Sequence, residues 1–219
     1  MLPILREGLV LELHFNELNG TTVYDLSGYN NNGTIYGALR VNEGFVRALS
    51  FDGVDDFVEV PDSPSIRLTS NMAFELWLKI LSAKETGADV VLSKGAYPNR
   101  HYRLEISWDL RRFVFGSDGS GFRYTPLGSV NPFIGRWIHL CFNRNNEEGW
   151  IELRVNFNEG VWRYTFTPGT TEPSDTYPLH LARSPNVLID EVLIYNRALS
   201  EEEIKTLYNY YTKKKIFER

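Results

Sequence analysis

The chain has 219 residues and a net charge of −5, and 42% of its residues are hydrophobic and 14% aromatic. This composition is sufficient to fill the interior of one large domain and excludes a disordered protein. The acidic balance argues against a nucleic-acid partner bound through its phosphates, and no apolar run approaches the roughly 20 residues of a membrane-spanning helix, so membrane insertion is not expected.

The single cysteine, Cys141, excludes an intrachain disulfide and a cysteine-based zinc site. It lies within an apolar strand pattern, where we expect an inert, covered thiol. Residues 1–8 form a short lead without the apolar core of a secretory signal peptide, so we expect either no export or a leader that has been removed.

From Leu9 onward, short runs of alternating apolar and polar residues are separated by Gly, Asn, Asp, Ser and Pro. This period of two predicts antiparallel strands joined by turns. In chain order the expected strands are residues 9–15, 47–51, 57–60, 72–81, 90–93, 102–107, 112–116, 136–144, 150–157, 161–167, 179–182 and 187–195. No long helical period interrupts them, which indicates an all-β body.

The alternation also predicts which side of each strand faces the core. The even positions of residues 72–80 are apolar, whereas Trp77 and its odd-numbered neighbours point the other way. The strands at 136–144 and 150–157 repeat this division, with tryptophans beside polar residues on their outward faces. Strands of this kind form a sandwich of two sheets, and we expect the outer surface of one sheet to be a platform for a ligand.

The C-terminal segment breaks the strand pattern. Residues 200–203 (Ser-Glu-Glu-Glu) form a capping box, which predicts the start of one short amphipathic helix. The residues that follow at helical spacing are Ile204, Leu207, Tyr208 and Tyr211. The acidic first turn and the lysines at 213–215 both complement the helix dipole, so we interpret this basic run as a solvated helix end, with a nucleic-acid or membrane contact as the alternative.

Three stretches in this order carry a resemblance to a known family. They are Asp25-Leu-Ser-Gly28 with Asn31-Asn-Gly33, then LSFDGVDDFVEVP at 49–61, then IDEVLIYNRALS at 189–200. With the strand pattern between them, the chain resembles the laminin G-like, concanavalin A-type jelly-roll family. The resemblance implies an all-β, antiparallel, two-sheet jelly-roll sandwich with a short C-terminal helix, whose first and last strands lie side by side. The domain would cover residues 9–212, after the lead at 1–8 and before a basic tail at 213–219.

Members of this family often carry calcium, an ion that takes several carboxylate, amide and carbonyl oxygens as ligands. By resemblance, the metal ligands would be Asp25, Asn30 or Asn32, and Asp190, and the ion would tie the first loop to the last strand. Asp25 alternatively forms an Asx turn without metal, and Asp190 alternatively pairs with Arg197 or caps a turn.

Three further carboxylates crowd around Gly53, namely Asp52, Asp55 and Asp56. They are either a second cation site or a hairpin turn with a solvated acidic rim. We prefer the turn, because Asp-Gly pairs are common turn chemistry.

No catalytic residue is expected, so the sequence does not predict an enzyme. Laminarinases of this fold carry Glu-x-Asp-x-x-Glu on one strand, and this chain has no such motif. Glu105 and Glu152 are expected on the same outer face, where the neighbouring Arg103 and Arg154 favour ion pairs over acid–base work. The four histidines lack zinc-ligand spacing.

The resemblance and the aromatic content together predict a non-catalytic, calcium-stabilised recognition module that binds carbohydrate, or a glycosylated or protein partner, at an extracellular, cell or virion surface. The candidate ligand-binding residues are Trp77, Trp137, His139, Trp150 and Arg154, with Tyr124 and Trp162 as further aromatic candidates. Each tryptophan is alternatively a packing residue. Two other functions stay open, a self-associating structural subunit of a virion, surface layer or adhesive filament, and a glycoside hydrolase or polysaccharide lyase of the same fold.

Overall fold

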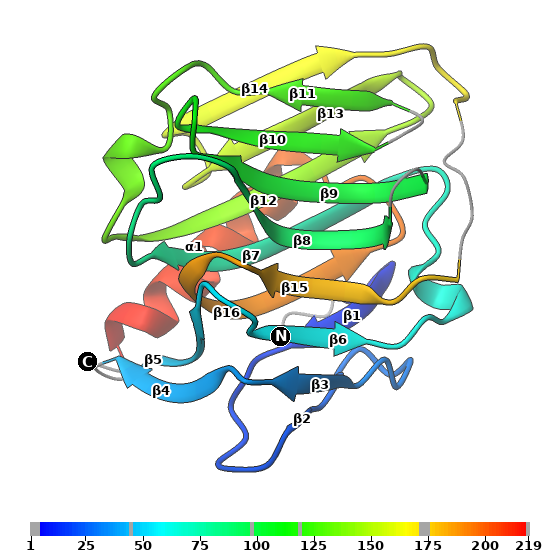
Figure 1. Ribbon diagram of the computed structural model, residues 1–219. Coiled ribbons are helices and arrows are strands. Elements are labelled where there is room, and N and C mark those ends of the chain that lie inside the picture. Colours follow the sequence, from blue (N-terminus) through cyan, green and yellow to red (C-terminus); the bar gives the residue numbers. More distant parts are fainter. Residues whose placement is uncertain (1–4, 44–45, 97–98, 118–119, 171–175, 218–219) are drawn as a thin grey trace.

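The structure is a computed structural model that describes residues 5–43, 46–96, 99–117, 120–170 and 176–217. Over these residues the chain forms two antiparallel sheets that lie face to face, with one helix outside them (Figure 1). Sheet A contains, in spatial order, β14 (Gly160–Thr165), β13 (Trp150–Val155), β12 (Trp137–Asn145), β7 (Met72–Ile80), β16 (Asn186–Tyr195), β5 (Val46–Asp52) and β4 (Leu39–Glu43), with β1 (Leu9–Leu13) paired to β16. Sheet B contains β11 (Gly121–Tyr124), β10 (Arg112–Ser117), β9 (Asn99–Ser107), β8 (Ala88–Ala96), β15 (Leu179–Arg183), β6 (Phe57–Val60), β3 (Gly33–Tyr36) and β2 (Thr22–Val23).

The all-β sandwich expected from the alternation is confirmed, and every expected strand is present with small shifts of its ends. Sequence reasoning missed four strands, β2, β3, β4 and β11. Three of these lie at sheet edges, and β3 lies next to an edge. An edge strand is held by the hydrogen bonds of a single neighbour and buries little surface, so its sequence carries little apolar alternation.

The main core fills the space between the two sheets. The inward-facing side chains of β7 are almost completely buried, as the alternation predicts. Phe74 of β7 stacks on Phe142 of β12, with ring centroids 4.7 Å apart, and meets Tyr102 of sheet B at 6.1 Å. Contacts of this kind across the two layers are the chief stabilisation of a β-sandwich.

The helix α1 (Glu201–Phe217) begins at the predicted capping box. The Ser200 backbone N–H donates to Glu203 Oε2 at 2.8 Å, and the Glu203 N–H donates to Ser200 Oγ at 3.3 Å. The helix is longer than expected, because it continues through the described part of the segment that was expected as a basic tail. The first four residues of the expected lead and the last two of the expected tail lie outside the described residues.

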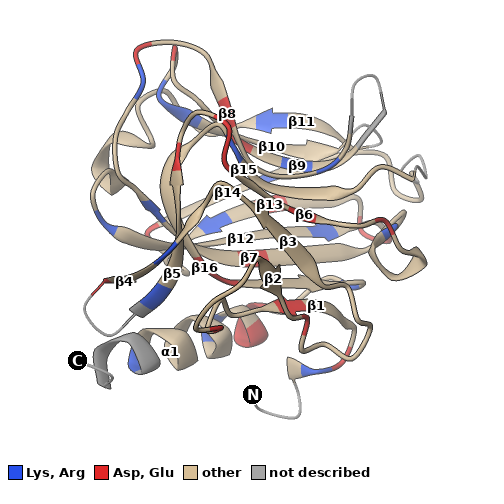
Figure 2. Ribbon diagram, turned by 60° about the horizontal axis from the view of Figure 1, so that its bottom comes forward, with Lys and Arg blue, Asp and Glu red and all other residues tan. Residues whose placement is uncertain are grey.

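The helix α1 lies across the outer face of sheet A (Figure 2). A second apolar cluster, separate from the main core, fills the space between them. The helix contributes Ile204, Leu207 and Tyr211 to this cluster, and all three are buried as the helical spacing predicts. Sheet A is therefore packed on both faces, by sheet B on one side and by α1 on the other.

The first and last strands of the sandwich lie side by side, as the resemblance implies. β1 pairs with β16 in antiparallel register, with Leu13 opposite Val192. Leu5 of the lead packs in the cluster under α1, and its carbonyl accepts a hydrogen bond from the Tyr195 hydroxyl at 3.2 Å. Within the described residues, no helix is both long and apolar enough to cross a bilayer.

Candidate functional site

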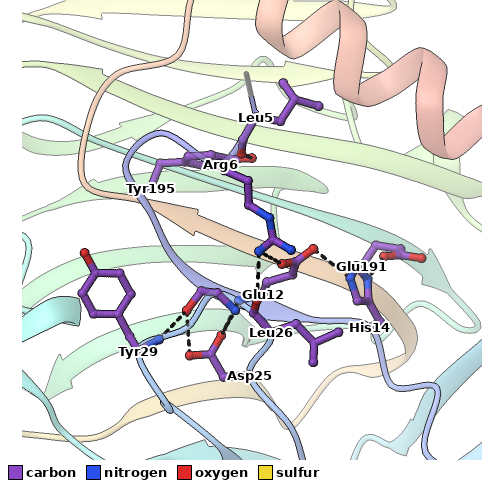
Figure 3. Close-up of polar contacts among 10 residues, drawn as sticks. Leu5, Arg6, Glu12, His14, Asp25, Leu26, Tyr29, Glu191 and Tyr195 are labelled. Atoms are coloured by element: carbon purple, nitrogen blue, oxygen red, sulfur yellow. Dashed lines mark hydrogen bonds and ion pairs between the residues drawn. The ribbon is translucent and has the colours of Figure 1, made fainter. Parts of the chain in front are cut away.

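The loop after β2 is organised around the carboxylate of Asp25, which is 8% exposed (Figure 3). Asp25 Oδ1 accepts the backbone N–H groups of Glu12 and Ser27, both at 2.9 Å. Asp25 Oδ2 accepts the Asn31 N–H at 2.9 Å and the Ser27 hydroxyl at 2.8 Å. A carboxylate has about four lone-pair sites, and all four accept hydrogen bonds here. Asp25 thus caps its own loop and fastens it to β1.

The other three expected metal ligands are Asn30, Asn32 and Asp190. Asn32 Oδ1 accepts the Asp25 N–H at 2.9 Å, and Asn30 is exposed with a left-handed backbone (φ 60°). Asp190 lies opposite Trp77 on the outer face of sheet A, where its Oδ1 accepts the N–H of the next residue at 2.9 Å. A calcium ion needs free oxygens converging on one point. The hydrogen bonds of Asp25 do not leave such oxygens, so this set does not fit a shared site, and calcium binding itself stays a prediction.

A buried charged network joins β1 to β16 beside this loop (Figure 3). The imidazole of His14 lies between two buried carboxylates, with its Nε2 2.9 Å from Glu12 Oε1 and its Nδ1 in contact with Glu191. Arg6 Nη1 donates to Glu12 Oε2 at 2.6 Å. Burial by itself lowers the pKa of His14, but the hydrogen bonds and negative charges of Glu12 and Glu191 outweigh it and raise that pKa to about 9. His14 therefore carries a positive charge at neutral pH and ties the two strands together.

The expected open platform on sheet A is corrected at three of its five residues. Trp77, His139 and Arg154 do lie on the outer face of this sheet, but they are at most 6% exposed. Trp77 stacks against Tyr208 of α1, with ring centroids 6.0 Å apart and planes 9° from parallel. The side chain of His139 lies 3.1 Å from Glu75 and contacts the same tyrosine. The helix covers these residues, so a sugar cannot stack on them while α1 is in place.

The remaining two residues of that platform are half-buried and have polar partners. Trp137 Nε1 donates to Glu43 Oε2 at 2.7 Å, and Trp150 Nε1 donates to Glu148 Oε2 at 2.6 Å. The guanidinium of Arg163 lies over the ring of Trp150 at 4.1 Å. One face of that ring is thus already occupied. The further candidate Trp162 packs against the main core.

The two carboxylates weighed for catalysis belong to different sheets. Glu105 is on β9 of sheet B and Glu152 on β13 of sheet A, so the expectation of a shared outer face is wrong. Each has an arginine partner, Arg103 for Glu105 and Arg154 for Glu152, as predicted. Cys141 is fully buried, and burial raises the pKa of its thiol, which agrees with the expected inert thiol.

An exposed aromatic group that sequence reasoning missed lies on the outer face of sheet B. Tyr36 on β3 and Phe57 on β6 are paired in the sheet and stack with ring centroids 4.6 Å apart and planes 17° from parallel. The ring of His180, on β15, meets Phe57 edge-on at 5.6 Å. Their strand neighbours Ile35 and Val58 are buried in the core. Alternation therefore directs this aromatic stack to the solvent side.

A hollow of about 250 Å³ adjoins the stack, and it combines apolar and charged groups. Its lining consists of Val54, Asp55, Asp56, Phe57, Arg183 and Ser184. The guanidinium of Arg183 lies 5.8 Å from the centre of the Phe57 ring. Lys84 fastens two of the surrounding loops, because its Nζ donates to Ser184 O at 2.6 Å and to Gly53 O at 3.4 Å. Lys84 thus holds together two of the loops that surround the hollow.

The acidic turn at the rim of this hollow has the hairpin geometry that the sequence favours. Asp52 Oδ1 accepts the Val54 N–H at 2.8 Å, and Asp56 Oδ2 accepts the Asp52 N–H at 2.8 Å. Oxygens of Asp52, Asp55 and Asp56 lie within 4.8 Å of one another, the one such group of three acidic, histidine or cysteine ligands among the described residues. Asp52 and Asp55 are exposed, so the solvated acidic rim is present.

The sequence contained a signal for this surface. In the strand Phe57-Val-Glu-Val60, the valines take the inward positions and Phe57 the outward one. A large aromatic side chain at an outward position of an alternating strand indicates either a covering element or an exposed contact surface. Its partners Tyr36, His180 and Arg183 come from strands far apart in sequence, so the group becomes visible only in the folded chain.

Comparison with known proteins gives the same architecture. The binding domain of Paraclostridial Mosquitocidal Protein 1 is similar to this chain with a TM-score of 0.75 and 19% identity, over 94% of this chain and 53% of that one. The botulinum neurotoxin serotype D ligand binding domain in complex with N-acetylneuraminic acid gives 0.74 and 15%, over 93% and 51%. A Trypanosoma rangeli sialidase in complex with sialic acid gives 0.67 and 17%, over 92% and 32%.

These likenesses are to the fold, and this chain spans about half of each toxin binding domain and about a third of the sialidase. No curated protein matches the chain by sequence. The family model described as the concanavalin A-like lectin/glucanases superfamily, laminin G type, matches residues 52–205. That match covers most of both sheets and the start of α1, and the chain therefore belongs to the concanavalin A-like lectin/glucanases superfamily.

Proposed function

We propose that the protein is a non-catalytic recognition module that binds carbohydrate in the hollow beside Tyr36 and Phe57, at an extracellular, cell or virion surface. The observation that carries the proposal is the solvent-facing aromatic stack at the edge of a hollow of about 250 Å³. Tyr36 is 44% exposed, so its ring is accessible to a ligand without any rearrangement of the sandwich.

The chemistry of the hollow suits a sugar. Hexose rings have an apolar C–H face that packs on aromatic rings, and their hydroxyls need hydrogen-bond donors and acceptors placed around that face. The stacked rings of Tyr36 and Phe57 supply the apolar surface. Arg183 supplies a donor, and Ser184 supplies both a donor and an acceptor, on the walls of the same hollow.

Another hollow on the surface is less suited to this role. It measures about 270 Å³ and is lined by His14, Asn16, Glu17, Tyr24 and Leu26. Its single aromatic ring has no stacked aromatic partner among the described contacts, and its imidazole lies between two carboxylates. The hollow at Phe57 therefore has the larger continuous aromatic surface.

The solved structures support a carbohydrate ligand by analogy of fold. The serotype D neurotoxin ligand binding domain is described in complex with N-acetylneuraminic acid, and cell entry of the type C neurotoxin is described as dependent on two ganglioside molecules. Two solved structures of this fold are thus described with sugar-containing ligands.

A glycan array tests the proposal. We expect the full chain to retain at least one class of glycan, and Tyr36→Ala and Arg183→Gln to weaken that binding about tenfold, which corresponds to the loss of one stacking or charged contact. Tyr210→Ala is the control, because Tyr210 is a tyrosine that is 39% exposed but lies on α1, outside sheet A. The proposal fails if no glycan is retained, or if the control loses as much affinity as Tyr36→Ala.

A further inference from the structure

Negatively charged side chains outnumber positively charged ones around the hollow. Asp55 and Asp56 line the hollow, and Asp52 lies next to them, since oxygens of all three carboxylates lie within 4.8 Å of one another; we call these three residues the acidic rim. Arg183 is the one guanidinium in the lining of the hollow. An anionic ligand seated on Phe57 would therefore meet more negative than positive charge.

The neighbouring basic groups do not offset this excess. The ammonium of Lys84 donates to Asp89 Oδ1 at 2.6 Å and to two backbone carbonyls, so its positive charge is paired with Asp89. The ring of His180 lies 3.1 Å from Glu59, and burial lowers its pKa, an effect that the hydrogen bond to Glu59 opposes and the charge of Arg183 reinforces. The lowered pKa of His180 reduces its positive charge, so His180 does not offset the acidic rim.

The exposure of the acidic rim determines how strongly it repels a bound anion. Asp52 and Asp55 are in contact with solvent, so their repulsion of an anion acts through a high dielectric. Each such carboxylate at about 8 Å from a bound anionic group weakens its binding about twofold at low ionic strength, and the two together about fivefold. Salt weakens the repulsion, because the Debye length is about 10 Å at 0.1 M.

We infer that the acidic rim at Asp52 and Asp55 makes the hollow selective for uncharged glycans over sialylated or sulfated ones. This inference rests on the proposed carbohydrate-binding function. By this inference, the ligand preference of the present chain differs from that of the solved toxin domain that is described with N-acetylneuraminic acid bound. The recognition chemistry is then an uncharged sugar ring packed on Tyr36 and Phe57, with hydroxyls bound by Arg183 and Ser184.

The test is an array on which each neutral glycan is printed beside its sialylated form and its sulfated form. At low salt we expect each neutral glycan that binds to exceed its charged counterparts about fivefold, and we expect this ratio to shrink in high salt. In the double variant Asp52→Asn/Asp55→Asn the preference should fall to about one, with neutral binding retained. Both substitutions keep an acceptor oxygen, including the one that binds the Val54 N–H.

The control is Glu202→Gln, which removes an exposed charge from the first turn of α1, on the other side of sheet A. It should leave the ratio unchanged. Equal or stronger binding of the charged forms, unaffected by the double variant, overturns the selectivity while the carbohydrate-binding function stands. Retention of no glycan in any form overturns both.

Discussion

The role of Asp25 can be decided by one substitution, Asp25→Ala. The carboxylate accepts four hydrogen bonds, and two of them come from the buried backbone N–H groups of Glu12 and Asn31. Alanine removes the acceptor and leaves these two donors without a partner inside the protein. The other two donors belong to Ser27, which is partly exposed and finds water in its place.

The expected loss follows from those contacts. A buried donor that loses its partner costs about 1 to 3 kcal/mol, and the two exposed bonds add little. We therefore expect Asp25→Ala to lower the free energy of unfolding by about 3 kcal/mol. For a single domain of this size this is a large part of the stability, which is typically about 5 to 15 kcal/mol.

The assay is equilibrium urea unfolding followed by tryptophan fluorescence, with calcium in one series and a chelator in the other. The hydrogen-bond role predicts the same loss in both series, since no metal contributes. Asp55→Ala is the control, an exposed aspartate whose removal should change stability by less than about 0.5 kcal/mol.

The opposite pattern would refute this reasoning. If calcium stabilises the wild type, and Asp25→Ala is destabilised in calcium but matches the wild type in chelator, then Asp25 is a metal ligand and not a loop cap. Linkage requires that result, because an ion bound only to the native state raises its stability.

Three further predictions concern the layer between sheet A and α1. The folded-state pKa of His14 is raised to about 9, so the stabilisation that protonated His14 gives the folded state is complete below about pH 6.5 and is lost as the pH rises through 9. Between these two pH values, the unfolding free energy of the wild type should fall by about 2 to 3 kcal/mol relative to that of His14→Gln. Urea titration of both proteins at each pH measures this difference. An unchanged difference between the two proteins across that range would contradict the ion-paired histidine. Trp77→Ala should destabilise the protein by about 3 to 5 kcal/mol and remove its stacking on Tyr208, seen as a loss of near-ultraviolet dichroism, whereas Trp150→Ala, half-buried, should have a smaller effect. Cys141 should react with a thiol reagent only after unfolding, and rapid labelling in native buffer would show that α1 does not cover it stably.

The residues buried under α1 show what the alternation of the strands in sheet A does not report. Alternation places Trp77 and His139 outward, and the structure agrees with that direction. What alternation does not report is whether another element packs on the outward side. A signal was present, since outward positions also carry the apolar residues Ala73, Cys141 and Leu193, which a solvated face would not require.

The residues that surround the hollow at Phe57 also could not be grouped from local sequence patterns. Strand β6 pairs with β3 and with β15, which lies more than a hundred residues further along the chain. No local pattern joins Tyr36 to Arg183, because their proximity depends on the strand order of sheet B. The single outward Phe57 indicated a contact surface, but its partners and its acidic rim required the pairing.

The sequence by itself determined the features that depend on near neighbours. Period-two alternation determined twelve of the strands and their inward faces, since a pleated chain turns successive side chains to opposite sides, and Ser200 with Glu203 determined the start of α1. Only the tertiary structure decided which outward faces remain open to a ligand. That outcome depends on where α1 docks and which strands become neighbours, and both are set by the burial of apolar surface between segments far apart in the chain.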